Sequence, residues 1–285
     1  MSDSILIIGA TGSVGYEVAK RLNELNIRTK IAVRNPDKAI ASGLENVDYI
    51  QFNYLEHSTF KDAFDGIDKV VLVSPPSYLQ LQEHVIKAVD EAINSGVKTI
   101  VNISAISIES DLDKPMKEIE DHIRKSTVDA VFLRPNCYMQ NFKDLFRDLI
   151  IEENQIIVPA ENAKSCFIDV RDVAEVAVKA LTDESMKNQT FKLTGKQQLN
   201  MHVVAHMFSE NLNKEIEYID VAENLFEKRL RNAGWPEGTI VGTLQLCSHI
   251  KNGTTAQLTN DLERLLGREP IRFEQFIKDY SDNWS

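Results

Sequence analysis

The sequence predicts an α/β fold with a doubly wound parallel sheet and a smaller, mainly helical C-terminal lobe. First, four apolar residues, 5–8, are followed at once by a glycine turn and then by a helical pattern. Second, apolar segments of strand length alternate with helical patterns as far as residue 135, without a hairpin signal. This order is typical of parallel strands covered by helices on both faces. Third, the pattern loosens beyond residue 150 and becomes mainly helical after Gly195.

The first half of the chain supplies the elements of the expected sheet. Strands are expected at 5–8, 29–33, 47–52, 69–73, 99–103 and 130–133, and helices after the glycine turn and at about 58–64, 78–94 and 114–125. Val18, Leu22 and Leu25 share one face of the first helix, and Leu79 is among the apolar positions of the helix at 78–94. In such a sheet, ligands bind at the carboxyl ends of the strands.

The second half is expected to return to the sheet once. A helix at 170–181 and a strand at 190–193 belong to a mixed segment, about 165–195, that rejoins the core. Short strands are expected at 155–159 and 215–219, and helices at about 200–212, 221–233, 237–250, 257–266 and 272–280. We therefore expect a Rossmann-type domain over 1–153, and over 154–285 the returning segment with a small substrate lobe that covers the cleft.

A glycine-rich turn, Gly9-Ala-Thr-Gly-Ser-Val-Gly15, joins the first strand to the first helix. Gly9 allows a sharp turn, Gly12 keeps a Cβ away from a pyrophosphate, and Gly15 allows close packing of the helix. The helix N-terminus would present unpaired N–H groups to the phosphates. Because the turn stands between a strand and a helix, it predicts a dinucleotide site. The expected contacts are Gly9, Thr11, Gly12, Ser13, Val14 and Gly15.

The end of the second strand favours NADP(H). A site for NAD has an acid here that binds the ribose hydroxyls, whereas this strand ends at Val33 without one. Arg34 and Lys38 follow, and they supply cationic donors for a 2′-phosphate. The alternative, that both are solvated loop charges, stays open.

Further cofactor contacts are expected directly after the other strands, because the carboxyl ends of parallel strands meet at one edge of the sheet. These positions are Asn53, Tyr54, Ser74, Pro75, Ser104 and Pro135. Together with the glycine turn and the end of the second strand, they complete the predicted cofactor site.

Composition excludes some classes of partner. The 285 residues carry a net charge of −11, which argues against nucleic acid and anionic membranes. No apolar run is long enough to span a bilayer, and no signal peptide is expected. Three widely spaced cysteines, Cys137, Cys166 and Cys247, fit free thiols in a reducing cytoplasm. We expect a cytoplasmic monomer or homodimer that acts on a small molecule.

No metal site is expected. His202 and His206 have the spacing of ligands on a helix. The sequence lacks both the glutamate of H-E-x-x-H and a nearby third ligand, so the spacing alone does not predict zinc.

Several motifs resemble those of the NmrA-like family of atypical short-chain dehydrogenases/reductases. They are the glycine turn, the strand end at 33–36, Ile103-Ser-Ala105, and the segments 133–141, 167–174 and 266–270. The resemblance covers nearly the whole chain. It implies a Rossmann domain with a small C-terminal substrate lobe, and usually a preference for NADP(H). The family includes NAD(P)H-dependent quinone and azo-dye reductases, benzylic ether reductases and redox-sensing regulators.

The chain departs from the wider superfamily in its catalytic residues. Related reductases carry Tyr-x-x-x-Lys on the helix after the fifth strand, where the tyrosine gives a proton and the lysine lowers its pKa. Here residues 114–125 contain no tyrosine. The chain's one Tyr-x-x-x-Lys, at Tyr16 and Lys20, lies on the first helix and is interpreted as structural.

Four residues remain as catalytic candidates. Ser104 could hydrogen-bond a substrate carbonyl or the nicotinamide, or could serve as a cap or turn residue. Lys117 could reach the cleft as an acid, or could be an exposed lysine. Tyr138 and Asn141 are three residues apart, so a helix would place them on one face toward the cofactor. The resemblance implies that their segment lines the nicotinamide pocket.

Two functions follow from this sequence. The first is an NADPH-dependent oxidoreductase that transfers a hydride to a small electron-poor quinone, azo, imine or carbonyl compound without the tyrosine acid. Such acceptors need little acid catalysis, because solvent can protonate a stabilised product. The alternative is a non-catalytic binding protein of NmrA type that senses the NADP(H) redox state.

Overall fold

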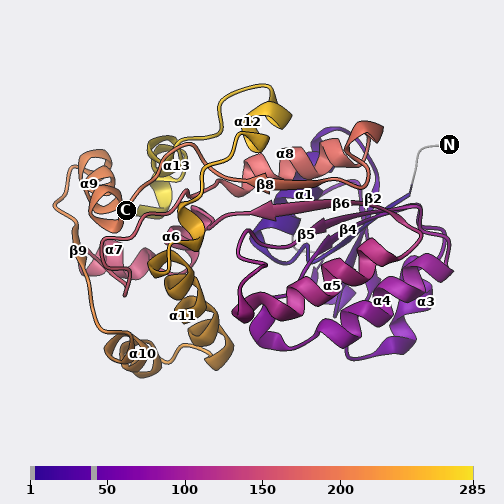
Figure 1. Ribbon diagram of the computed structural model, residues 1–285, viewed down its shortest axis with the longest axis horizontal. Helices are drawn as coiled ribbons and strands as arrows, with labels where there is room; N and C mark the ends of the chain where they lie inside the picture. Colours follow the sequence, from indigo (N-terminus) through magenta and orange to yellow (C-terminus); the bar gives the residue numbers. More distant parts are fainter. Residues whose placement is uncertain (1–3, 40–43, 285) are drawn as a thin grey trace. The chain divides into compact units, whose positions relative to one another are not determined.

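The computed structural model describes residues 4–39 and 44–284 and confirms the predicted fold class. Its main feature is a seven-stranded sheet in the order β3-β2-β1-β4-β5-β6-β8 (Figure 1). The strands are β1 (Ile5–Ile8), β2 (Thr29–Val33), β3 (Val47–Gln51), β4 (Lys69–Val73), β5 (Thr99–Ile103), β6 (Asp129–Pro135) and β8 (Thr190–Leu193). In this order, each strand from β3 through β2, β1, β4 and β5 to β6 pairs in parallel with its neighbour. The order reverses at β1, where a doubly wound sheet binds its ligand.

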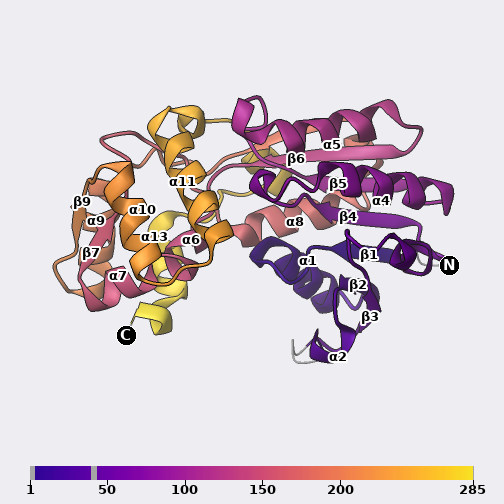
Figure 2. The ribbon, with the colours of Figure 1, turned by 90° about the horizontal axis from the view of Figure 1, so that it is seen from below.

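Helices cover both faces of this sheet. They are α1 (Ser13–Glu24), α2 (Pro36–Ala39), α3 (Phe60–Phe64), α4 (Gln82–Asn94), α5 (Lys114–Lys125) and α8 (Val170–Ala180). Helices α3, α4 and α5 lie on one face, and α1 and α8 lie on the other (Figures 1 and 2). Alternate strand residues such as Leu6, Leu72 and Ile100 pack against the buried side chains of α3, α4 and α5.

Most predicted elements of the sheet are found where the sequence places them. The strands at 29–33, 69–73 and 99–103 and the helix at 114–125 have the predicted bounds. The helix predicted at 78–94 begins only at Gln82. Leu79 instead ends a short 3-10 turn, η3 (Ser77–Leu79), and is 45% exposed. Gln80 has a left-handed φ of 51°, which turns the chain before α4 starts.

The chain forms two compact units, one from the residues up to Arg134 with Val173–Phe191, and the other from Pro135–Asp172 and from Lys192 onward. The second unit begins at Pro135, whereas the sequence pattern predicts a division after residue 153. Within 4–39 and 44–284, no helix combines the length and the apolar character needed to cross a membrane.

The second unit packs short elements around an aromatic core. Its two-stranded parallel sheet pairs β7 (Gln155–Ile157) with β9 (Glu217–Ile219). Its helices are α6 (Gln140–Asp144), α7 (Arg147–Glu152), α9 (Met201–Leu212), α10 (Glu223–Asn232), α11 (Glu237–Lys251), α12 (Asp261–Leu266) and α13 (Phe273–Asp279). Phe142 of α6 contacts Phe273 edge to face, with ring centroids 5.1 Å apart. Helices α6 and α7 were not predicted, because fewer than two turns give little periodic signal.

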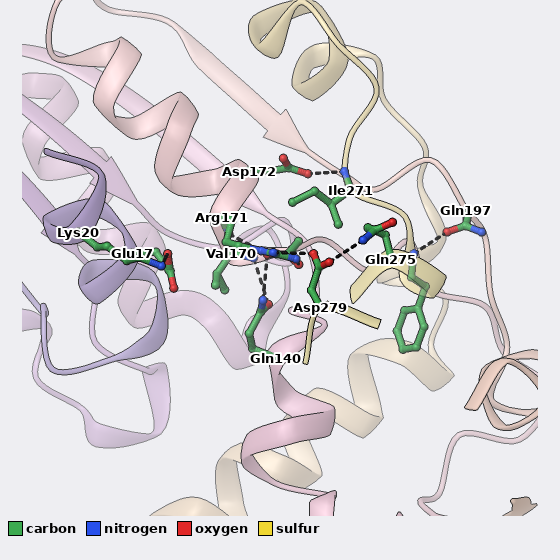
Figure 3. Close-up of polar contacts among 12 residues, drawn as sticks. Glu17, Lys20, Gln140, Val170, Arg171, Asp172, Gln197, Ile271, Gln275 and Asp279 are labelled. Atoms are coloured by element: carbon green, nitrogen blue, oxygen red, sulfur yellow. Dashed lines mark hydrogen bonds and ion pairs between the residues drawn. The ribbon is translucent and has the colours of Figure 1, made fainter. Parts of the chain in front are cut away.

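A hydrogen-bond network around a buried carboxylate organises the start of α8; Figure 3 labels Gln140, Arg171 and Asp279 of this network. Asp169 is fully buried, and it accepts hydrogen bonds from the Arg171 backbone N–H (2.9 Å) and from its guanidinium Nη2 (2.7 Å). The side-chain amide of Gln140 bridges Asp169 (2.9 Å) and the backbone N–H of Val170 (3.1 Å). Arg171 also pairs with Asp279 at 2.7 Å. Within the second unit, this network joins the residues at the start of α8 to α6 and α13.

We expect Asp169→Ala to lower the free energy of unfolding by about 3 kcal/mol, because it removes a helix cap and leaves the Gln140 amide and part of the Arg171 guanidinium without their acceptor. Urea unfolding followed by circular dichroism measures the change. The matched control is Glu227→Ala, which breaks an exposed pair with Arg231 and should leave the unfolding curve nearly unchanged. Equal curves for the two variants would contradict this role of Asp169.

Candidate functional site

The glycine turn between β1 and α1 is held by close contacts of its backbone. Gly9 has a φ of 97°, and a Cβ there would lie 2.9 Å from the Cβ of Val73. A Cβ on Gly15 would overlap the carbonyl of Gly9 and lie 2.8 Å from the Cα of Ala10. These contacts are shorter than Cβ atoms tolerate, so the packing of α1 on the turn requires glycine at both positions.

Gly12 differs from the other two glycines. A Cβ there would meet only the carbonyl oxygen of Gly9, at an ordinary 3.6 Å, and its φ of −95° suits any residue. The protein therefore has no steric reason of its own for a glycine at this exposed position. A ligand that approaches the backbone supplies such a reason.

The first turn of α1 offers backbone donors beside Gly12. Gly12 is the N-cap, and among the described residues no side chain caps the helix there. The first intrahelical hydrogen bond runs from the N–H of Tyr16 to the carbonyl of Gly12, at 2.9 Å. The preceding amides of Ser13, Val14 and Gly15 lie at the positive end of the helix dipole. Thr11 and Ser13 are exposed and Val14 is buried.

The end of β2 carries one exposed cation whose side chain the structure describes. Val33 is buried and Arg34, directly after it, is exposed. Arg34 forms no ion pair with any residue in the described part of the chain. Lys38 falls in α2, and its side chain lies outside what the structure describes. Arg34 thus presents a guanidinium at the carboxyl edge of the sheet, where it can bind a phosphate.

Asn53 and Tyr54 follow β3. The side-chain oxygen of Asn53 accepts a hydrogen bond from the N–H of Leu55 (3.1 Å), which closes a turn. Tyr54 packs edge-on against Phe52, with centroids 5.0 Å apart. Its hydroxyl is buried without a partner among the described residues, and burial raises its pKa.

Ser74 and Ser104 follow β4 and β5, and both are buried. The Ser74 Oγ accepts a hydrogen bond from the Asn102 side-chain amide at 2.9 Å. The Ser104 Oγ has no hydrogen-bond partner in the described residues. Pro75 is half-buried. Sequence reasoning missed Asn102, although an asparagine inside an otherwise apolar strand could have drawn attention to it.

A second buried carboxylate joins the loops that follow β4 and β5. Asp113 of η4 (Asp111–Asp113) is 5% exposed. It accepts hydrogen bonds from the hydroxyls of Ser77 (3.1 Å) and Ser107. Two loops at the carboxyl edge of the sheet are therefore held together by one side chain.

Helix α5 carries Lys117 and no tyrosine. The Lys117 side chain is 39% exposed, and its ammonium lies 3.4 Å from Asp121 and 3.7 Å from Glu109. Two carboxylates thus already balance its charge. On α1, Lys20 pairs with Glu17 at 3.7 Å (Figure 3), and Tyr16 is 37% exposed.

Pro135, Tyr138 and Asn141 belong to the second unit. Pro135 is buried at the end of β6. Tyr138 precedes α6 and forms a parallel bridge with Ile168, whereas Asn141 lies inside α6. The two residues therefore do not share a helical face as expected; a turn joins them, with the Asn141 N–H 3.2 Å from the Tyr138 carbonyl. Tyr138 is half-buried, and burial raises its pKa.

The three cysteines are buried, and His206 of the two spaced histidines pairs with a carboxylate. All three cysteines are buried free thiols, and burial raises the pKa of Cys137 to about 12. Such thiols are unreactive at neutral pH. His206 pairs with Glu210 at 3.4 Å. Over the described residues, no group of three or more histidine, cysteine or acidic side chains could hold a metal ion.

A doubly wound sheet with this glycine turn at its switch point defines a dinucleotide-binding protein. The chain belongs to the NmrA-like family, whose model matches residues 1–276. It is 27% identical to Prestalk A differentiation protein A of Dictyostelium discoideum, over 99% of this chain and 94% of that protein. It is 28% identical to an NAD(P)H azoreductase of Xenophilus azovorans, over 97% of this chain and 98% of that protein.

One solved structure extends the comparison. Citrobacter sp. triphenylmethane reductase, complexed with NADP(H), matches with a TM-score of 0.87 and 25% identity, over 97% of this chain and 99% of that chain. The likeness therefore covers both units of the chain.

Because packing requires glycine at position 15 but not at position 12, alanine should destabilise the protein at Gly15 and not at Gly12. We expect Gly15→Ala to lower the melting temperature by several degrees, since its Cβ overlaps the turn. Gly12→Ala should have the melting temperature of the wild type, because its Cβ meets no atom closer than 3.6 Å. Differential scanning calorimetry without ligand compares the two variants. A loss at Gly12 as large as at Gly15 would show that both glycines serve packing alone.

Proposed function

We propose that this protein is an NADPH-dependent reductase that transfers a hydride to a small, electron-poor acceptor such as a quinone, azo, imine or carbonyl compound. The observation that carries the proposal is the turn at Gly12, an exposed glycine at the N-terminus of α1 that packing does not require. Family membership supports it, as do the printed activities of the azoreductase and the triphenylmethane reductase.

The residues of the first unit fit this cofactor. The amides of the turn from Gly9 to Gly15 suit a pyrophosphate, and the guanidinium of Arg34 suits a 2′-phosphate. The buried hydroxyl of Ser104, which has no hydrogen-bond partner within residues 4–39 and 44–284, suits a polar group at the nicotinamide end. We further propose that Asn53, Tyr54, Ser74, Pro75 and Pro135 line the cofactor beyond these contacts.

When it is bound, NADPH supplies the hydride, and the protein has to bind, orient and shield the reactants. No tyrosine acid is available on α5. We propose that Tyr138, whose phenol is neutral at pH 7 and can donate a hydrogen bond, and Asn141 position the acceptor by hydrogen bonds. Lys117 is the weakest of the candidate acids, because Glu109 and Asp121 hold its ammonium. Solvent then delivers the proton to a product that is already stabilised.

We expect NADPH to bind more tightly than NADH, and Arg34→Ala to reduce this preference about ten- to a hundredfold through loss of a charge-assisted contact worth about 1.5–3 kcal/mol. Titration of each cofactor by tryptophan fluorescence gives the Kd values. The matched control is Arg28→Ala, at the other end of β2, where the guanidinium pairs with Asp48 at 2.9 Å. Equal affinities of the wild type for the two cofactors would contradict the assignment.

Steady-state kinetics with a panel of quinones and azo dyes tests the reaction itself. We expect NADPH oxidation by the wild type. Tyr138→Phe and Asn141→Ala should lower kcat/KM about tenfold or more without a change in the Kd of NADPH. Tyr16→Phe is the control and should retain full turnover. Bound NADPH without turnover of any acceptor would instead favour a cofactor-binding regulator.

A further inference from the structure

Asn102 is the most unusual polar residue of the sheet. It lies in β5, is 0% exposed, and stands between Val101 and Ile103, which are also buried. A buried strand of a parallel sheet normally carries apolar side chains here. An amide costs free energy in such a place unless its hydrogen bonds are made. The presence of an amide at this buried position therefore indicates a role other than folding.

The contacts of Asn102 determine which way its amide points. Its Nδ2 lies 3.5 Å from the carbonyl oxygen of Leu72 and 2.9 Å from the Ser74 Oγ. A carbonyl oxygen can only accept, so the atom that faces both is the nitrogen. The Ser74 hydroxyl is consequently an acceptor toward Asn102. Its own hydrogen is then left to donate elsewhere, and no acceptor for it is found among the described residues.

Two further polar atoms of this cluster lack partners. The Oδ1 of Asn102 and the Oγ of Ser104 are both buried without a hydrogen bond to any residue that the structure describes. Leu72 is paired with Asn102 in the register of β4 and β5, so Ser74 and Ser104 come just beyond the paired ends of the two strands. Buried polar atoms are almost always satisfied in a working protein.

The place of the cluster in the sheet indicates which part of the dinucleotide it meets. Arg34 follows β2 on one side of β1, and β4 and β5 lie on the other side. A dinucleotide binds across this switch point, with its adenosine ribose at the end of β2. The ends of β4 and β5 therefore belong to the nicotinamide half.

We propose that Asn102 is a positioning residue of the cofactor site: it holds Ser74 so that the Ser74 hydroxyl donates a hydrogen bond to an oxygen of the nicotinamide riboside. The inference rests on the proposed function for the identity of the cofactor, but not on turnover. It assigns a role to a side chain that does not itself touch the cofactor.

The test compares Asn102→Val, Ser74→Ala and the double variant. Valine suits a buried parallel strand, so the variant should fold, and Asn102→Ala replaces it if it does not. We expect the Kd of NADPH to rise about three- to tenfold in Asn102→Val, the effect of one net hydrogen bond. Adenosine 2′,5′-bisphosphate lacks the nicotinamide riboside, and its Kd should not change. The double variant should bind NADPH no more weakly than Ser74→Ala.

Thr29→Val is the matched control. Thr29 also has a buried hydroxyl without a partner among the described residues, but it begins β2 at the opposite edge of the sheet. Its removal should leave both Kd values unchanged. The proposal would be overturned if Asn102→Val left the Kd of NADPH unchanged, or weakened both ligands equally. It would also be overturned if the loss of NADPH affinity in the double variant equalled the product of the two single losses. A wild type that binds NADPH but does not turn over would contradict the proposed reaction alone.

Discussion

The contact between Gly15 and the carbonyl of Gly9 is the constraint on which the rest of the site depends. It brings the first turn of α1 against the end of β1 without an intervening side chain. The donors at the start of α1 therefore lie beside the point where the strand order reverses. A methyl group at Gly15 would push the helix away from the strand, whereas a methyl group at Gly12 would meet only the carbonyl oxygen of Gly9, at 3.6 Å.

At the carboxyl edge of the sheet, some buried polar groups have hydrogen-bond partners and others do not. Asp113 is buried but accepts hydrogen bonds from two serines, so the cost of its burial is compensated. Asn102 and Ser104 keep polar atoms buried without partners among the described residues. Uncompensated polar burial at the carboxyl edge of a parallel sheet is expected where a ligand completes the hydrogen bonds, and it would otherwise be costly.

Much of the fold could be predicted from the sequence, because the central strands β1, β4 and β5 are short, mainly apolar runs that end at a glycine or a serine. The strands at 69–73 and 99–103 have the predicted bounds for this reason. The start of α4 could not be predicted, since the left-handed turn at Gln80 leaves no signal in an apolar pattern. Tyr138 likewise follows a long-range bridge with Ile168 instead of the local helical spacing.

The candidate site was only partly visible in the sequence. The glycine turn and Arg34 each directly follow a predicted strand, so the sequence alone indicated their position at the carboxyl edge of the sheet. The environment of Ser74 depends on Asn102, which is distant in the chain and appears in the sequence as one polar residue in an apolar strand. Hydrogen bonds between neighbouring strands leave no pattern in a single sequence.

The most direct test of the account is a crystal structure of the protein with NADP⁺. We expect pyrophosphate oxygens within hydrogen-bond distance of the backbone amides between Gly9 and Gly15, and the 2′-phosphate at the guanidinium of Arg34. We also expect the nicotinamide half at the ends of β4 and β5. A pyrophosphate bound away from the glycine turn, or an adenosine half at Ser74 and Ser104, would contradict it.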